Sequence, residues 1–583
     1  MKTLREHLDY EPVPLQFGTS GRRGLVVHLT QLEVYLNALA EVHYLQSLPA
    51  SAGGVVAGQE FYFATDLRPS STQFAPAEQD RGELAQAIAA AMAAAGLKPV
   101  FLGSLPTPAL ASYALERRRG SMMVTGSHIP FDRNGYKTNT ARGELLKKDE
   151  APIQRRVDEV RRQLYATPFA ESPFNHRGMF KHGHRQLPAP EADAAGAYLR
   201  RYADFFRGAT LRGQRLLVYQ HSAVGRDLLA ELLKRLGAEV ICAGRSEVFV
   251  PIDTENIDQA QLEFVQALAV EAWRSHGPID AVVSTDGDSD RPLILGVEPL
   301  AGPVPCQVRF YGGDLVGMVV AQFLGADAIV VPISCNDAID RGALRTVLEP
   351  KTRIGSPFVI AGMEQALAKG RLAVCGWEAN GGFLTGSDLQ RGGAMLSALP
   401  TRDAFLPILG VLFAAAGQSL SSVFSRLPAR FSRAALLKNF PRPASLRIVR
   451  AFSPTEDCIK EASFEGDRVI LHGEAGNELA STAGSEGELK AIRSGLVRFF
   501  KPTSGFGSLA RINYVDGVRL CFDNGDVAHF RPSGNADELR IYAVADTQER
   551  AEAIAKLGVA DPGGILRQLE TATPADQAQK RHY

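Results

Sequence analysis

The sequence predicts a mixed α/β protein, with three consecutive mixed α/β sheet domains of similar topology and a C-terminal α+β domain with an antiparallel sheet. Three observations support this prediction. Short apolar runs alternate with segments of helical pattern up to about residue 432. Polar loops rich in glycine follow those runs. Beyond residue 433, short alternating segments are separated by Asp-Gly and Asn-Gly pairs, which are strong hairpin signals.

Changes of pattern along the 583 residues indicate four domains. We expect their boundaries at 1–190, 191–305, 306–432 and 433–583. The contents of 45% apolar and 22% charged residues are ordinary for a globular protein. Basic and acidic side chains balance at 64 each, which argues against a broad surface for nucleic acid or anionic membrane. We therefore expect no nucleic-acid partner and no membrane partner.

The six cysteines are scattered, without any C-x-x-C spacing, which is typical of a reducing cytosol. The N-terminus has no apolar core for a signal peptide, and no apolar run reaches the length of a membrane span. The expected location is therefore the cytoplasm.

The first expected domain alternates strands and helices. Its elements are a strand at 61–65, a helix at 82–95, a strand at 99–103, a helix opening at 106–108 and a strand at 122–124. Residues 148–190 change in texture, and we interpret them as a solvated connection or insertion. A histidine-rich metal site is the alternative for the basic stretch at 170–185.

The three later domains are also predicted from their expected strands and helices. The second is predicted from strands at 216–219, 239–242 and 279–284 and a helix at 225–236, and the third from strands at 328–332 and 372–375 and a helix at 357–369. The fourth is predicted from strands at 469–472, 510–514, 518–522 and 527–530 and a helix at 547–557.

The central feature of the first domain is the loop at residues 125–130 (TGSHIP), which directly follows an apolar run. A strand end that delivers Ser127 and His128 into a loop marked by Gly and Pro is typical of a site that presents a nucleophile. A hydroxyl in this position is able to carry a phosphoryl group if a metal ion and basic side chains reach it. Ser127 is therefore the candidate nucleophile.

Three alternating aspartates follow the expected strand at 279–284. They are Asp286, Asp288 and Asp290. Alternation places three hard oxygen donors on one side of an extended turn, which suits Mg²⁺. A calcium EF-hand is rejected because its sixth and twelfth positions are Arg291 and Val297 here. A solvated acidic turn is the alternative, disfavoured because the aspartates directly follow an apolar strand.

Three more loops carry groups suited to phosphate or sugar. Residues 17–24 (FGTSGRRG) place Arg23 in a glycine-rich loop suited to phosphate contact, with a surface turn as the alternative. Residues 531–535 (RPSGN) fit a phosphate dianion, although their composition also fits a hairpin turn. Glu378 and Asn380 are suited to hydrogen-bonding sugar hydroxyls, and a structural turn is again the alternative.

These loops, in this order, resemble those of the α-D-phosphohexomutases, the superfamily of phosphoglucomutase, phosphomannomutase and phosphoglucosamine mutase. The resemblance spans nearly the whole chain. Residues 125–130 match the family's phosphoserine loop, usually TASHNP, with Ser127 as the phosphorylated residue and His128 following it. Residues 134–137 (NGYK) match the NGxK that comes next, which makes Lys137 a candidate proton-transfer group.

The remaining loops match as well. Residues 17–24 match the FGTSGxRG loop, with Arg23 at its Arg, and residues 286–291 match the DGDxDR metal loop. Residues 378–381 (EANG) stand where the family has its sugar-binding GExSG loop, and residues 531–540 match the phosphate-binding RPSGTEPxxR. This last match assigns phosphate binding to Arg531, Ser533, Gly534, Asn535 and Arg540.

The chain departs from the family pattern at several positions. Gly126 and Ile129 replace the usual Ala and Asn beside the nucleophile, and Asn380 replaces the sugar-loop Ser. Trp377 precedes the sugar-loop Glu and is expected to pack on an apolar sugar face, and residues 535–537 replace Thr-Glu-Pro. The form TGSHIP with DRNG is most similar to bacterial phosphomannomutases, so mannose phosphate is the expected substrate.

The resemblance implies an intramolecular phosphotransferase that interconverts hexose 6-phosphate and hexose 1-phosphate, with its four domains arranged around a central cleft. Phosphorylated Ser127, with Mg²⁺ bound by it and by the three aspartates, would pass its phosphoryl group to the sugar. The product of that step, hexose 1,6-bisphosphate, would turn round and return its other phosphate. The remaining assigned roles are stabilisation of the transferring group by Arg23 and Arg291, acid and base catalysis by Lys137 or His128, and binding of ring hydroxyls by Glu378 and Asn380.

Several alternatives remain open. Phosphoglucomutase and phosphoglucosamine mutase keep the chemistry and change the sugar. A metal-dependent sugar phosphatase and a non-catalytic sugar-phosphate sensor are more distant. The expected partner is the hexose phosphate substrate, and the expected assembly is a monomer or small homo-oligomer. Residues 170–185 and 435–505 match no family motif.

Overall fold

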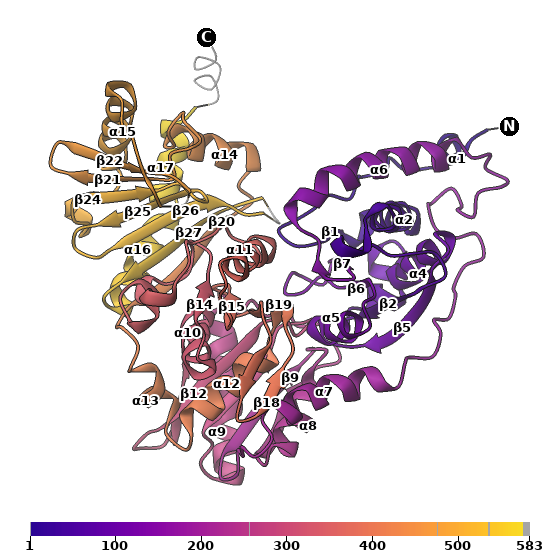
Figure 1. The fold of residues 1–583 in the computed structure, drawn as a ribbon, viewed down its shortest axis with the longest axis horizontal. Helices are drawn as coiled ribbons and strands as arrows, with labels where there is room; N and C mark the ends of the chain where they lie inside the picture. Colours follow the sequence, from indigo (N-terminus) through magenta and orange to yellow (C-terminus); the bar gives the residue numbers. More distant parts are fainter. Residues whose placement is uncertain (1, 256, 475, 535–536, 575–583) are drawn as a thin grey trace. The chain divides into compact units, whose positions relative to one another are not determined.

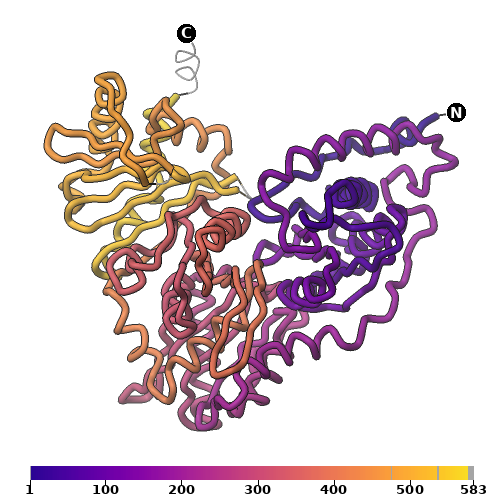
Figure 2. Tube along the Cα trace, in the orientation of Figure 1, coloured from indigo at the N-terminus to yellow at the C-terminus, as the bar shows by residue number. Residues whose placement is uncertain are grey.

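The computed structural model describes residues 2–255, 257–474, 476–534 and 537–574 (Figure 1). The chain divides into two compact units, which Figure 2 follows along the Cα trace. The first contains Met1–Ala328 and Gly355–Phe424, and the second contains Ile329–Ile354 and Ser425–Tyr583. The expected mixed α/β sheets are present in the first unit and the expected antiparallel sheet in the second. The division into four domains and the central cleft stay predictions.

The first sheet has the strand order β1-β7-β6-β2-β5, with β8 paired to β7. Its strands are β1 (Arg22–Leu25), β2 (Glu60–Thr65), β5 (Lys98–Ser104), β6 (Ser121–Val124), β7 (Arg133–Thr140) and β8 (Gly143–Glu144). β2 pairs in parallel with β5 and β6, whereas β7 is antiparallel to β6 and β1. The chain runs from β2 to β5 on one side of β2, and then from β5 back to β6 on its other side. The carboxyl ends of β2 and β6 therefore border a topological switch point, where α/β folds bind ligands.

Helices cover both faces of this sheet. The main ones are α2 (Gln31–Ser47), α4 (Leu84–Ala94) and α5 (Thr107–Glu116), accompanied by the short elements α1 (Leu4–His7), η1 (Val26–His28), η2 (Ala50–Ala52), α3 (Pro69–Thr72), β3 (Phe74–Ala75), η3 (Pro76–Glu78) and β4 (Arg81–Gly82). Right-handed crossovers in opposite directions place α4 and α5 on opposite faces. Phe61 and Phe63 of β2 accordingly share a core with Ile88 of α4, whereas Tyr62 contacts Tyr113 of α5 edge to face.

A long helix, α6 (Lys147–Ala166), occupies the first half of the segment that was expected to be a solvated connection. That expectation is wrong for these residues. Ile153, Val157 and Val160 form one buried face that belongs to the same core as α2, and Figure 1 shows α6 alongside α2. Their spacing is helical, but the many charged residues between them and Pro152 concealed it. The following loop does include buried aromatics, with Phe174 stacked on Phe180.

The second sheet has the order β10-β9-β11-β12-β13. Its strands are β9 (Arg215–His221), β10 (Glu239–Arg245), β11 (Ala281–Thr285), β12 (Pro292–Pro299) and β13 (Cys306–Phe310), and its helices are α7 (Asp193–Phe205), α8 (Arg226–Arg235) and α9 (Gln259–His276). β10, β9 and β11 are parallel, as the strand–helix–strand pattern predicted, and β12 and β13 extend the sheet antiparallel. The aspartate loop begins where β11 ends.

The last part of the first unit contains a small sheet in which β16 pairs antiparallel with β15 and β19. Its elements are α10 (Gly313–Leu324), α11 (Ser356–Ala368), β15 (Val374–Trp377), β16 (Phe383–Thr385), β17 (Leu389–Arg391), β18 (Ala394–Leu396), β19 (Leu399–Asp403), α12 (Phe405–Ala415) and α13 (Leu420–Phe424). The helix expected at 357–369 is therefore present. None of the described helices combines the length and the apolar character that crossing a membrane requires.

The second unit is dominated by an antiparallel sheet of order β20-β27-β26-β25-β24-β21-β22-β23. The chain enters this unit through β14 (Ala328–Val330), η4 (Asp337–Asp340) and η5 (Ala343–Val347). The sheet strands are β20 (Phe431–Lys438), β21 (Glu461–Glu465), β22 (Arg468–His472), β23 (Glu478–Leu479), β24 (Leu509–Asn513), β25 (Val518–Phe522), β26 (Val527–Pro532) and β27 (Glu538–Ala545). The helices are α14 (Arg442–Ala451), α15 (Ala483–Leu496), α16 (Gln548–Val559) and α17 (Ile565–Ala572), with η6 (Pro502–Ser504) between α15 and β24.

Both predicted hairpins of this sheet are confirmed, because β24–β25 and β25–β26 are antiparallel neighbours. Gly517 and Gly525 have φ angles of +78° and +86°, the conformation that makes glycine necessary at these turns. The unexplained segment 435–505 supplies β21, β22 and β23 and thereby extends the sheet beyond β24.

A buried acidic face of α2 holds the N-terminal loop in place. Glu41 is 1% exposed and accepts hydrogen bonds from Arg22 Nε, Tyr136 Oη (3.2 Å) and Thr138 Oγ1. Arg22 is fully buried, and its Nη1 also donates to the Leu15 carbonyl oxygen at 2.6 Å. The carboxylate of Glu41 therefore holds β1, which contains Arg22 and Arg23, against β7. Arg23 thus lies in a strand, at the end of the segment 17–24 that was expected to be a loop.

Replacing Glu41 by Gln should destabilise this part of the chain. The Arg22 guanidinium would stay buried without a compensating charge, a change that typically costs about 3–5 kcal/mol. We expect a clear downward shift of the first unfolding transition in calorimetry. Glu11→Gln is the matched control, because Glu11 pairs with Arg5 on the surface, where ion pairs contribute little. Equal transition temperatures for the two variants would contradict this account.

Candidate active site

Ser127 lies in the loop after β6, and its side chain is almost completely buried. Its φ of +55° is left-handed, which is uncommon for a residue other than glycine. The N–H of Ser127 donates to Thr125 Oγ1 at 2.7 Å and so holds this turn. The Ser127 Oγ donates to Oδ2 of Asp286 at 2.8 Å. The predicted nucleophile and the predicted metal loop are therefore in direct contact.

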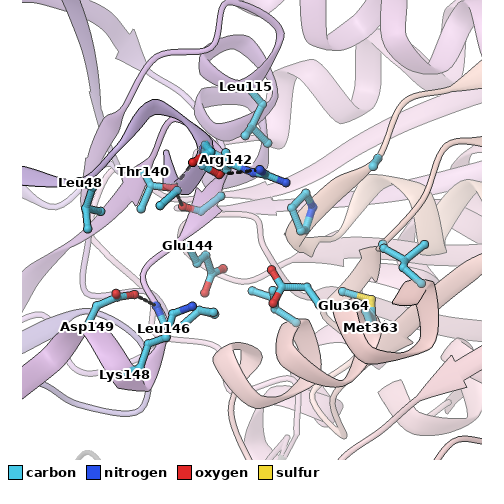
Figure 3. Close-up of a pocket in the computed structure, with 18 of the residues that line it drawn as sticks. Leu48, Leu115, Thr140, Arg142, Glu144, Leu146, Lys148, Asp149, Met363 and Glu364 are labelled. Atoms are coloured by element: carbon cyan, nitrogen blue, oxygen red, sulfur yellow. Dashed lines mark hydrogen bonds between the residues drawn. The ribbon is translucent and has the colours of Figure 1, made fainter. Parts of the chain in front are cut away.

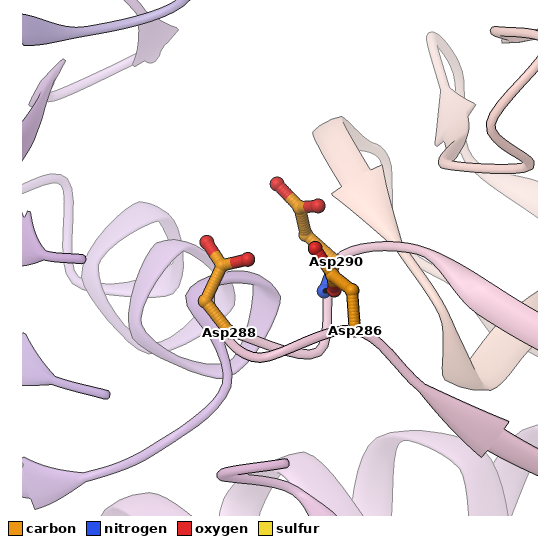
Figure 4. A group of neighbouring side chains, drawn as sticks. All are labelled: Asp286, Asp288 and Asp290. Carbon is orange, nitrogen blue, oxygen red and sulfur yellow. Dashed lines mark hydrogen bonds between the residues drawn. The ribbon is translucent and has the colours of Figure 1, made fainter. Parts of the chain in front are cut away.

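The three aspartates of that loop converge, as Figure 4 shows. Asp286, Asp288 and Asp290 are fully buried, and one oxygen of each lies within 4.8 Å of the others. Asp286 Oδ1 accepts the N–H groups of Asp290 (3.0 Å) and Arg291 (3.2 Å), which closes the turn. Ser289, with φ of +57°, provides the reversal that brings the alternating side chains to one side.

The chemistry of this cluster fits a divalent cation. Burial and the like charges of Asp288 and Asp290 raise the pKa of Asp286 well above its usual range, a penalty that a bound cation would remove. Among the described residues, Asp288 Oδ1 and Asp290 Oδ1 have no hydrogen-bond partner although both are buried. Unsatisfied buried carboxylate oxygens are costly, and hard oxygen donors are the ligands that Mg²⁺ prefers.

Lys137 contributes its charge to the same cluster. It lies on β7 opposite Met123 of β6, and its Nζ donates to Oδ2 of Asp288 (2.8 Å) and of Asp290 (2.6 Å). Burial opposes ionisation of Asp288, but Lys137 and the Thr107 hydroxyl outweigh it and hold the pKa of Asp288 well below its usual range. The candidate proton-transfer group and the aspartates are thus brought together.

The other predicted catalytic groups lie close by. The Nδ1 atom of His128 is 3.5 Å from Ser127 Oγ. Arg291 Nε lies 3.5 Å from Asp290 Oδ1. The Nη1 atom of Arg23 donates to the carbonyl oxygen of its neighbour Arg22, and desolvation lowers the pKa of Arg23 to about 10, so it remains charged at neutral pH. Their roles in catalysis stay predictions.

Arg68 is a functional candidate that the sequence analysis did not identify. Arg68 follows β2 and is 1% exposed. Its guanidinium donates to four main-chain carbonyl oxygens of the Ser127 loop and its exit: Ser127 (2.9 Å), Ile129 (2.5 Å), Pro130 (2.7 Å) and Arg133 (2.8 Å). Its position after the predicted strand at 61–65 was the signal that could have identified it. β2 is parallel to β6, so Arg68 lies at the same edge of the sheet as the Ser127 loop.

Gly126 is explained by this arginine. A Cβ at position 126 would lie 2.5 Å from Arg68 Cζ, closer than real Cβ atoms approach other atoms. Arg68 is further held by Asp66, whose Oδ2 is 3.3 Å from its Nε, and by the ring of Phe249, 4.0 Å from its Cζ. The departure from the family's Ala therefore makes room for a buried guanidinium beside the nucleophile.

The predicted sugar loop follows β15 and places Glu378 near the aspartates. Glu378 Oε2 accepts from Nη1 of Arg402 at 2.8 Å, and Arg402 also contacts Asp290. Asn380 is 6% exposed, and its Oδ1 accepts the Gly382 N–H at 2.9 Å. Asn380 therefore helps to form the turn of this loop, and its role in sugar binding stays a prediction. The structure also adds Arg402, which sequence reasoning missed.

Trp377 does not lie in the position that was expected. Its ring is 1% exposed and stacks on Phe383 with the planes 4° apart. A Cβ on Gly317 of α10 would lie 2.3 Å from this ring, so the helix is shaped to accommodate it. The expectation that Trp377 packs on a sugar is wrong, because the indole fills the protein core.

In the second unit, the predicted phosphate loop connects β26 and β27. Arg531 Nε donates to Asp516 Oδ1 at 3.1 Å, and Arg540 Nη2 donates to Glu538 Oε2 at 3.0 Å. The Ser533 N–H donates to the Glu538 carbonyl oxygen at 2.9 Å. Two predicted guanidinium groups are thus held at one hairpin.

A third arginine, Arg442, contacts the same hairpin. Asn535 lies outside the described residues. Arg442, at the start of α14, was not predicted, and its Nη1 donates to the Ser533 carbonyl oxygen at 3.4 Å. It adds a third cation to the hairpin that contains Gly534.

A cavity of about 840 Å³ also lies in the first unit (Figure 3). Glu144 on its wall accepts hydrogen bonds from Ser356 Oγ and Thr401 Oγ1, each at 2.6 Å. Among the described residues that line it, neither Ser127 nor any of the three aspartates is present. The cavity is therefore separate from the candidate active site, although Glu144 and Thr401 link it to β19.

The site combines a buried serine, hydrogen-bonded to a cluster of three carboxylates, with lysine and arginine side chains. On a fold of several α/β sheets, this combination defines a phosphoryl-transfer enzyme.

Similarity to known proteins identifies the family within this class of enzymes. Residues 14–163 match the family model described as phosphoglucomutase/phosphomannomutase, alpha/beta/alpha domain I, and residues 312–431 match the model for alpha/beta/alpha domain III. These two matches include the Ser127 loop and the Glu378 loop.

Full-length relatives agree. A phosphomannomutase of Sinorhizobium fredii is 36% identical over 549 residues, which cover 94% of this chain and 98% of that protein. A phosphomannomutase of Salmonella muenchen is 35% identical over 543 residues, covering 92% and 93%. The solved structure of a phosphoglucomutase/phosphomannomutase family protein from Burkholderia thailandensis shares the fold, with a TM-score of 0.61 at 16% identity over 99% of both chains. The chain belongs to the phosphoglucomutase/phosphomannomutase family of phosphohexomutases.

Replacing Gly126 by Ala should impair the site even though Ala is usual in the family. The new methyl group would collide with Arg68, and overpacking of this kind costs about 1–3 kcal/mol. Displacement of the Ser127 loop should reduce kcat by roughly 10- to 100-fold, because misplacement of a reacting group by about 1 Å has effects of this size. Steady-state kinetics and thermal unfolding measure both effects.

The control for this variant is Gly487→Ala on α15, where an added Cβ has open space around it. We expect this substitution to leave activity and stability unchanged or to improve stability slightly. A Gly126→Ala enzyme with the kcat and unfolding temperature of the unchanged protein would refute the steric account of Arg68.

Proposed function

We propose that the chain interconverts hexose 6-phosphate and hexose 1-phosphate, with mannose phosphate as the favoured substrate, through phosphorylated Ser127 and a bound hexose 1,6-bisphosphate. The observation that carries this proposal is the 2.8 Å hydrogen bond from Ser127 Oγ to Asp286 within the aspartate cluster. The names of the two relatives at 36% and 35% identity support mannose phosphate. The scattered spacing of the six cysteines supports a cytoplasmic location.

In the first half-reaction, the bond between Ser127 Oγ and phosphorus breaks while the 1- or 6-hydroxyl oxygen of the sugar bonds to the phosphorus. The proton of that hydroxyl passes to a base, for which the His128 ring and Lys137 Nζ are the candidates. Lys137 accepts a proton only as a neutral amine, so this role requires that it first lose the proton with which it bonds the aspartates. In the second half-reaction, the other phosphate returns to Ser127 Oγ and the same base returns the proton. When bound to the aspartates, Mg²⁺ would offset the negative charge of the transferring group.

The remaining residues hold the substrate. Arg23 and Arg291 stabilise the transferring phosphoryl group, and Glu378 and Asn380 bind ring hydroxyls. The phosphate that is not being transferred is bound in the second unit by Arg531, Ser533, Gly534, Asn535 and Arg540. Arg68 fixes the conformation of the Ser127 loop by donating hydrogen bonds to its main-chain carbonyl oxygens. The nucleophile is therefore positioned before the sugar binds.

Coupled assays with mannose, glucose and glucosamine monophosphates identify the preferred sugar. We expect the highest kcat/KM with mannose phosphate. A higher kcat/KM with glucose or glucosamine phosphate would leave the mutase mechanism unchanged but would change the assigned substrate. Free phosphate released in step with substrate loss would indicate the phosphatase alternative instead.

Replacing Ser127 by Ala should abolish turnover and leave the fold intact, because the variant lacks the oxygen that carries the phosphoryl group. Intact-mass measurement before and after λ-phosphatase treatment should show one removable phosphate on the unchanged protein and none on the variant. The control is Ser494→Ala, an exposed helical serine that should behave like the unchanged protein. Near-normal activity of the Ser127→Ala enzyme would end the assignment.

Replacing Arg531 by Ala should mainly raise KM, because a charge-assisted contact to the substrate phosphate is lost. Hydrogen bonds to charged groups contribute about 1.5–3 kcal/mol, so KM should increase at least tenfold while kcat changes little. Arg468→Ala is a control on the same sheet, since Arg468 is exposed on β22. An unchanged KM for Arg531→Ala would contradict the role of this loop in phosphate binding.

A further inference from the structure

Arg402 joins two loops that have separate expected tasks. It lies on β19 and is 3% exposed. Its Nε donates to Oδ2 of Asp290 at 3.1 Å, and its Nη1 donates to Oε2 of Glu378 at 2.8 Å. One guanidinium therefore bonds a carboxylate of the candidate metal loop and the carboxylate of the candidate sugar loop.

The chain is built closely around this side chain. A Cβ on Gly382 would lie 2.5 Å from Arg402 Cδ, so the sugar loop leaves space for the arginine stem. Both neighbours of Arg402 are anchored: Thr401 Oγ1 donates to Glu144 at 2.6 Å, and Asp403 accepts from Tyr198 Oη at 2.7 Å. The backbone that carries the guanidinium is thus held from both sides.

Electrostatics explains why both contacts are needed. Glu378 and Asp290 are buried carboxylates, and a buried charge without a partner is costly. A planar guanidinium is able to donate to two carboxylates in different directions, whereas an ammonium acts as a point charge. Arg402 therefore orients Glu378 and also places a positive charge beside the cation-binding oxygens.

We propose that Arg402 is a positioning residue that sets the orientation of Glu378 for the sugar and restrains the affinity of the aspartate cluster for its divalent cation. This inference rests on the proposed function for the identity of the sugar ligand. It makes two separable claims, one on substrate binding through Glu378 and one on cation binding through Asp290.

The substrate claim is tested by a double-mutant cycle with Arg402→Met and Glu378→Gln, measuring KM and kcat with mannose phosphate. Each single variant should raise KM about tenfold or more with a smaller change in kcat. The double variant should lose little more than either single variant, because Arg402 acts through Glu378. Independent, multiplicative losses would overturn this claim.

The cation claim is tested without turnover, by titrating Mn²⁺ against each purified protein and following the free ion by electron paramagnetic resonance. Arg402→Met should bind Mn²⁺ several-fold more tightly, because a positive charge next to Asp290 is gone. Glu378→Gln keeps that charge and should bind Mn²⁺ no more tightly than the unchanged protein. Unchanged or weaker binding by Arg402→Met would overturn the claim.

Arg402→Lys keeps the experiment decisive if the Met variant does not fold. Lysine retains the charge but does not reach both carboxylates, so Mn²⁺ affinity should stay near that of the unchanged protein while KM still rises. A Lys variant with an unchanged KM would overturn the bridging role. Arg391→Met, an exposed arginine on β17, is the matched control and should alter neither quantity.

The two proposals fail in different ways. If the unchanged protein shows no mutase activity with any hexose phosphate, the proposed function fails, yet the Mn²⁺ titrations still test the contact between Arg402 and Asp290. If the unchanged protein is active but the cycle is multiplicative and Mn²⁺ affinity is insensitive to Arg402, the positioning role alone fails.

Discussion

The concentration of buried charge around Ser127 is the constraint on which the rest of the first unit depends. Three carboxylates whose oxygens approach within 4.8 Å repel one another in a protein interior. Lys137 from β7 and Arg402 from β19 supply opposing charge, and the cluster is suited to a divalent cation as well. The fold must therefore bring the ends or edges of strands from three different sheets to one place.

Glycines adjacent to buried arginines recur in this site. Gly126 leaves space for Arg68 behind the nucleophile loop, and Gly382 leaves space for Arg402 behind the sugar loop. In both cases the guanidinium holds groups that the chemistry needs in fixed positions, main-chain carbonyl oxygens in the first and two carboxylates in the second. The departure from the family pattern at position 126 is thus a steric consequence of a neighbouring side chain.

Much of the fold was predictable from local pattern. Local sequence signals, each within a few residues, predicted the strand ends before Ser127 and Asp286 and helix α11. The hairpins at Gly517 and Gly525 were predicted in the same way. Helix α6 was missed because charged residues dominate its sequence, and its few apolar positions gain meaning only against the core that contains α2. Arg402 was missed for a related reason: no motif surrounds it, and its partners are distant in sequence.

The amino-acid sequence was sufficient to identify the candidate chemical groups, which are Ser127, three alternating aspartates, Lys137 and the arginines suited to phosphate. Which of these groups contact one another became known from the folded chain. In the fold, Ser127 contacts Asp286, and Trp377 is buried in the core and not in the site. Arg68 and Arg402 are buried beside the site as well. The physical reason is that loop motifs encode local backbone geometry, whereas burial and the pairing of charges are settled by packing between strands far apart in the chain.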